Sequence, residues 1–193
     1  MKPKLSIILA LSLAASPAAA HLPPGEYGSF MAGVTHPLFG LDHVLAMIAV
    51  GLWAAQIGGR ALWQVPTAFV GAMLAGFGLA LAGLPLPLVE PMILASIMLL
   101  GLVVALALRP SAGWAMALVG ALALFHGHAH GGELGSAAAL QFGAGFALAT
   151  AGLHLVGLAV ALLFARALRN GSGLVLRAMG AATGCAGALI ALG

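Results

Sequence analysis

The chain has 193 residues, of which 63% are hydrophobic and only 6% are charged, and its formal net charge is +3. Soluble domains carry charge on about a quarter of their residues, so this composition excludes an ordinary soluble enzyme or binding domain. The lone cysteine, Cys185, excludes an internal disulfide framework and a thiolate zinc site. Basic residues stand singly at segment ends, which argues against a nucleic-acid partner. We therefore expect an all-α polytopic protein whose environment is the lipid bilayer.

Residues 1–20 have the pattern of a cleaved signal peptide. Lys2 and Lys4 precede the short apolar run 5–15, and residues 16–20 end in an A-x-A cleavage pattern. Cleavage there makes His21 the mature N-terminus and leaves residues 21–193 as one transmembrane domain. The mature N-terminus then faces the periplasm.

Six apolar segments follow, and each is long enough to span a membrane at about 20 residues. They cover residues 30–57, 63–83, 89–108, 113–132, 137–165 and 173–192, and Gly, Pro and Arg residues mark the breaks between them. The first and fifth segments are long. We expect them to be tilted, or broken at Pro37 and Gly40 in the first and at Gly143, Gly145 and Gly152 in the fifth.

The arginines indicate how the segments are oriented. With the N-terminus outside, every arginine falls on the cytoplasmic side, as the positive-inside rule requires. These are Arg60, Arg109, Arg166, Arg169 and Arg177, whereas Glu26, Glu90 and Glu133 lie on the outer side. The pattern predicts a bacterial inner-membrane protein with both termini in the periplasm. Small residues at helical spacing, such as Gly71, Ala75 and Gly78, are expected to let these helices pack closely.

Seven histidines are the most unusual feature of so apolar a chain. In the segment 126–133, His126, His130 and Glu133 share one face of a helix, and His128 points to the opposite face. Imidazole with carboxylate is a ligand set for divalent transition metals, and ionisable groups within a membrane are functional by default. We therefore expect His126, His130 and Glu133 to contact a metal ion, although a water-exposed polar helix end is the simpler alternative.

A second group contains His36, Asp42 and His43. The two histidines are seven residues apart and align if the segment is helical, whereas Asp42 lies about 100° round the helix. Asp42 is then a metal ligand, the acceptor of a histidine N–H, or a cap of a helix that begins near Gly40. Met47, one turn further on, is more easily explained as a lipid-facing or core residue than as a ligand.

Three further histidines are weaker candidates for metal contact: His128, His154 and His21. His154 lies near the middle of the fifth segment, where it either hydrogen-bonds across helices or takes part in an ion pathway. His21, as an N-terminal residue, offers an amine and an imidazole to a metal. Glu90 precedes Pro91 and suits the first turn of a helix, so a structural role is favoured.

The segments 36–56 and 125–133 resemble the two motifs of the HupE/UreJ family of nickel permeases. The first reads H-x5-D-H from His36 to His43, and the second matches F-H-G-x-A-H-G-x-E from Phe125 to Glu133. The resemblance covers almost the whole chain. It implies that the residues required for transport are His36, Asp42, His43, His126, His130 and Glu133, with His128 at a variable position.

The resemblance also implies uptake of nickel, sometimes cobalt, for hydrogenase or urease. Ni²⁺ or Co²⁺ is then a transported substrate rather than a cofactor, and the protein is not an enzyme. No nucleotide-binding motif is present, so we expect facilitated diffusion driven by the membrane potential, with proton exchange as a second possibility. The residues by themselves leave open an intramembrane metalloenzyme, a metal sensor and the oligomeric state.

Overall fold

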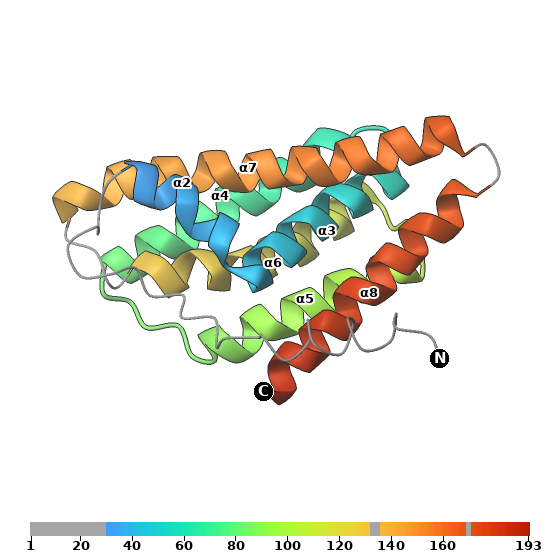
Figure 1. Cartoon of the computed structure of the whole chain (residues 1–193). Coiled ribbons are helices and arrows are strands. Elements are labelled where there is room, and N and C mark those ends of the chain that lie inside the picture. Colours follow the sequence, from blue (N-terminus) through green and yellow to red (C-terminus); the bar gives the residue numbers. More distant parts are fainter. Residues whose placement is uncertain (1–29, 132–135, 169–170) are drawn as a thin grey trace, which may run out of the picture.

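The computed structural model describes residues 30–131, 136–168 and 171–193, and Figure 1 shows them as a bundle of helices. The signal-peptide segment, His21, Glu26, Glu133 and Arg169 lie outside the described residues. All regular elements in the described ranges are α-helices, which confirms the predicted all-α class. They are α2 (Phe30–Phe39), α3 (Leu41–Ile57), α4 (Ala61–Leu81), α5 (Val89–Ala105), α6 (Ala112–Gly131), α7 (Ser136–Ala167) and α8 (Ser172–Leu192).

Several of these helices are membrane spans by length and composition. Helices α4, α6, α7 and α8 are each long and apolar enough to cross a bilayer, and α2 and α3 together make a fifth candidate. Helix α5 is apolar but has only 17 residues, fewer than the usual span of about 20. The chain is therefore a polytopic membrane protein, and the exact number of six spans stays a prediction.

The first predicted segment is broken, whereas the fifth is not. Helices α2 and α3 meet at an angle of 85°. Pro37 lies inside α2, and Gly40 is extended between the helices, with φ −82° and ψ 108°. A proline ring removes one backbone donor and crowds the preceding turn, so a helix break close by is expected. Helix α7, in contrast, passes through Gly143, Gly145 and Gly152 as one helix of 32 residues.

Helix α3 lies inside the bundle. It packs against α7, α5 and α4, and Figure 1 shows it between α7 on one side and α5 with α8 on the other. Ala46, Met47, Val50 and Trp53 are at most 1% exposed. Met47 is thus a core residue, which is one of the two roles favoured from the sequence. The polar groups that α3 carries are consequently held in the apolar interior.

The described arginines gather at one end of the bundle. Figure 1 shows the α3–α4 and α5–α6 connections, the end of α7 and the start of α8 at the same end, opposite the α4–α5 connection. Arg60 and Arg109 lie in two of these connections, and Arg166 is in the last turn of α7. Arg177 Nε donates to the Ala105 carbonyl at the end of α5, at 2.8 Å. This gathering agrees with the predicted orientation, although the side of the membrane on which it lies stays a prediction.

Helix α4 packs closely on α6 through glycines, but not through those singled out from the sequence. A Cβ added at Gly76 would collide with the Leu124 carbonyl of α6, and one at Gly127 would collide with the Met73 carbonyl of α4. Gly71 and Gly78, in contrast, have nothing within 4 Å of an added Cβ. Their predicted role in close packing is wrong, because they lie on the face of α4 that points away from α6.

These two kinds of glycine predict opposite effects of the same substitution. Gly71→Ala should leave stability unchanged or raise it by up to about 1 kcal/mol, because alanine favours helix and the site is open. Gly76→Ala should destabilise by about 1–3 kcal/mol, because its methyl group meets backbone that must move. Thermal melting of the purified protein in detergent, followed by tryptophan fluorescence, measures both. Equal melting temperatures for the two variants would contradict the α4–α6 contact.

Candidate metal centre

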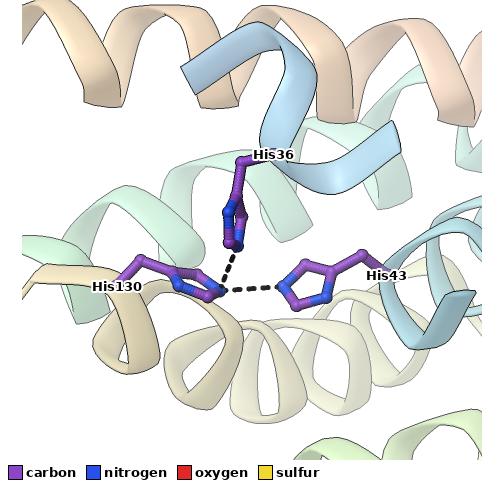
Figure 2. Close-up of side chains that lie close together, drawn as sticks. All are labelled: His36, His43 and His130. Carbon is purple, nitrogen blue, oxygen red and sulfur yellow. Dashed lines mark hydrogen bonds between the residues drawn. The ribbon is translucent and has the colours of Figure 1, made fainter. Parts of the chain in front are cut away.

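Three histidines from distant parts of the sequence meet inside the bundle (Figure 2). His36 comes from α2, His43 from α3 and His130 from the last turn of α6. His130 Nε2 lies 3.2 Å from His36 Nε2 and 3.0 Å from His43 Nε2. One ligand nitrogen from each of the three lies within 4.8 Å of the others. We call His36, His43 and His130 the outer cluster, because they lie far from the arginine-rich end.

The nitrogen separations suit a shared ion. Two nitrogens that each lie about 2.0–2.1 Å from one ion, at angles of about 90–110°, are roughly 2.9–3.4 Å apart. The two Nε2 separations from His130, 3.0 and 3.2 Å, fall within that range. A single proton on His130 Nε2 would be divided between two acceptors, whereas a cation satisfies three lone pairs at once. The outer cluster therefore offers three imidazole nitrogens that lie close enough together to hold a divalent transition metal.

Asp42 fixes the protonation pattern of His43. Its Oδ1 atom accepts from the backbone N–H of His43 at 2.8 Å and lies 3.0 Å from His43 Nδ1. A carboxylate oxygen is an acceptor, so Nδ1 carries the ring proton and Nε2 presents its lone pair to the cluster. Of the roles expected for Asp42, the structure therefore shows the histidine N–H acceptor. Helix α3 begins after Gly40 without a side-chain cap.

Because Gly40 has no side chain, it leaves room for the hydrogen-bonded side chains of Asp42 and His43. A Cβ at Gly40 would lie 2.8 Å from Asp42 Oδ1 and 3.1 Å from His43 Nδ1. The first of these separations is too short for a carbon atom, so any side chain at this position would displace the carboxylate. The bend that turns α2 toward α3 thus also leaves room for the bond that orients His43.

Aromatic rings enclose the outer cluster. The ring centroid of Phe146 is 6.0 Å from those of His36 and His43 and 5.4 Å from that of His130. His43 is 1% exposed and His36 is 9% exposed. Burial among apolar rings strengthens electrostatic interactions, and it makes an uncompensated charge costly.

His126 lies next to the outer cluster but is held by a different partner. Its ring centroid is 5.1 Å from that of His43. Its Nε2 atom lies 2.9 Å from Ser96 Oγ, and the Ser96 hydroxyl is also 2.6 Å from the Ile93 carbonyl. His126 and His130 therefore share a face of α6, as predicted, but His126 is one turn deeper and is not one of the three clustered ligands.

The remaining predicted residues lie elsewhere. His128 points away from the outer cluster, and its Nε2 donates to the Leu84 carbonyl at 2.8 Å. Glu90 is exposed in the first turn of α5, where the favoured structural role places it. Glu133 and His21 lie outside the described residues. His154 is buried in α7, away from the outer cluster.

Two residues near the site were not identified from the sequence. Ser96 holds His126, and the Phe69 ring packs against His126 and His154, with centroids 5.7 and 5.0 Å away. Ser96 is the only hydroxyl residue in the segment 89–108. A lone hydroxyl in an apolar span is thus a usable signal, whereas one phenylalanine among many apolar residues gives none.

This arrangement defines a polytopic helical membrane protein with a partly buried cluster of three imidazoles suited to a divalent transition metal. The sequence pattern of the family described as HupE / UreJ protein matches residues 9–190. The protein HupE of Rhizobium leguminosarum bv. viciae is 42% identical over 191 residues, which are 97% of this chain and 97% of that protein. The chain belongs to the HupE/UreJ family. No solved structure matches it.

The Asp42–His43 bond predicts a graded loss of metal affinity. Replacing a residue that orients a metal-binding histidine typically lowers affinity about 10–100-fold, and we expect this loss for Asp42→Ala. Asp42→Asn keeps an acceptor oxygen and should lose less. Titration of the purified protein with Co²⁺, followed by absorbance, measures both. Wild-type affinity in Asp42→Ala would show that the carboxylate does not orient His43 for binding.

Proposed function

We propose that this protein is a permease that carries Ni²⁺, or Co²⁺, into the cytoplasm through the outer cluster. The proposal rests on one observation above all. Three imidazole nitrogens of His36, His43 and His130 converge within the apolar bundle of a HupE/UreJ family member. Such groups are costly to bury, and in membrane proteins they mark ion pathways.

The chemistry of the donors narrows the substrate. Imidazole nitrogens suit nickel, cobalt, zinc and copper(II), whereas magnesium and calcium prefer oxygen ligands. The chain's only thiol, Cys185, is exposed on α8 and far along the chain from the outer cluster. Raw affinity in this series favours copper, so selection of nickel would depend on site geometry and metal availability. Asp42 adds negative charge beside the ligands, and Glu133 is proposed to add more.

The charges of the protein and of the ion indicate the direction of transport and its driving force. We place the protein in the bacterial inner membrane with both termini in the periplasm and the arginine-rich end in the cytoplasm. The outer cluster then receives the ion from the periplasmic side. An inside-negative potential contributes about 4–5 kcal/mol per 100 mV to the inward movement of two charges. The imported metal would supply an enzyme such as hydrogenase or urease.

Uptake into proteoliposomes tests the proposal directly. With an imposed inside-negative potential, wild type should accumulate Ni²⁺, whereas His43→Ala and His130→Ala should not, because each removes one of three converging ligands. His128→Ala is the matched control, since His128 is on α6 but points to the Leu84 carbonyl, and it should transport like wild type. Binding of Ni²⁺ by folded wild type without entry would instead favour a metal sensor.

The driving force can be separated from proton exchange in the same vesicles. Facilitated diffusion predicts Ni²⁺ entry under a potential alone, at equal pH on both sides, and loss of accumulation when the potential is collapsed. Proton exchange is the alternative because metal binding displaces protons from imidazole. We expect the potential to suffice, and entry that requires an acidic interior would overturn this expectation.

A further inference from the structure

Four buried side-chain atoms have no hydrogen-bond partner within the described part of the chain. They are His126 Nδ1, both ring nitrogens of His154, and Gln56 Oε1. A buried polar group left in this state is destabilising, because it has given up its hydrogen bonds to water without replacing them. His126 and His154 are 0% and 1% exposed. Two fully buried imidazoles with unpaired nitrogens in a membrane protein require an explanation.

The neighbours of His126 determine which of its nitrogens is available. The Ser96 hydroxyl has one proton, and it donates this proton to the Ile93 carbonyl at 2.6 Å. Ser96 Oγ must then accept the N–H of His126 Nε2 across their 2.9 Å contact. His126 Nδ1 is therefore left with a lone pair and no partner among the described residues. This tautomer control is the arrangement that metal-binding histidines use.

The two imidazoles lie deeper than the outer cluster. His126 precedes His130 by four residues on α6, which is about 6 Å along the axis. The backbone of His154 is held against Gly51, where an added Cβ would meet the His154 carbonyl. Gly51 is eight residues beyond His43 on α3, or about 12 Å further from the bend.

The Phe69 ring connects the two imidazoles. Its centroid is 5.7 Å from that of His126 and 5.0 Å from that of His154, against which it stands nearly perpendicular, at 83°. The ring centroid of His126 is also 5.1 Å from that of His43 in the outer cluster. The groups thus form a continuous series, from the outer cluster through His126 and Phe69 to His154.

We propose that His126 and His154 form a second, inner position for the divalent transition-metal ion, on the cytoplasmic side of the outer cluster. His126 Nδ1 and one ring nitrogen of His154 are its protein ligands. The Phe69 ring lies against both imidazoles. This inference rests on the proposed function, because it makes the inner position the next step of the same pathway.

A second position also solves an energetic problem of transport. An ion held by the three imidazoles of the outer cluster would leave slowly, and conduction needs sites weak or numerous enough to allow departure. Two divalent ions in adjacent positions repel one another, which favours release of the inner ion. With only two protein ligands, the inner position should bind more weakly than the outer one.

Equilibrium binding of Co²⁺ to the purified full-length protein in detergent tests the inner position without requiring transport. Wild type should bind two ions, one tightly and one weakly. His154→Leu should lose only the weak ion and keep the absorbance of the outer one, which also shows that the variant is folded. His128→Leu, the matched control, should bind both ions. His154→Gln, a milder change, should also weaken binding of the inner ion, because it removes the proposed imidazole ligand.

The outcomes separate this inference from the permease proposal. A single bound ion in wild type, or two bound ions in His154→Leu, would overturn the inner position, and His154 would then be a structural histidine packed on Phe69. Two ions in wild type and one in His154→Leu would support the inner position even if vesicles showed no Ni²⁺ entry. That last result would contradict only the permease. Ni²⁺ entry together with a single bound ion would contradict only the inner position.

Discussion

The 85° bend between α2 and α3 is the feature on which the rest of the site depends. A straight helix through residues 30–57 would place His36 and His43 two turns apart along one face, about 10 Å from each other. The bend at Gly40 instead turns α2 across α7, so that both rings reach the same His130 nitrogen. Gly40 is required twice, for the bend and for the space that Asp42 and His43 fill.

Close helix contacts hold this geometry in place. The backbone of α3 touches that of α7 at Gly51, and α4 touches α6 at Gly76. Without a hydrophobic driving force between helices in lipid, such close packing is a main source of association. The contacts also fix the depth of each histidine, because a helix that cannot slide keeps its side chains at one level. The packing of the helices therefore also determines the geometry of the site.

Hydrogen bonds to two histidines control which nitrogens can bind a cation. Asp42 accepts the N–H of His43, and Ser96 accepts that of His126, so each ring presents one lone pair to the interior. In an apolar environment a wrong tautomer would leave a buried N–H facing a metal ion. Small polar residues beside the ligands therefore matter as much as the ligands themselves, and Ser96 has this role although its sequence context is wholly apolar.

The sequence by itself determined the all-helical membrane class, the family, and the shared face of His126 and His130, and it left tilting or a break at Pro37 and Gly40 as alternatives for the first segment. These follow from composition, hydropathy, helical periodicity and two contiguous motifs, all of which are local properties of the chain. It did not determine which histidines converge, that Asp42 orients His43, or that Gly71 and Gly78 lie outside the close contacts. Only the tertiary structure decided these points, because they depend on how α2, α3, α6 and α7 cross, and no local pattern encodes a crossing.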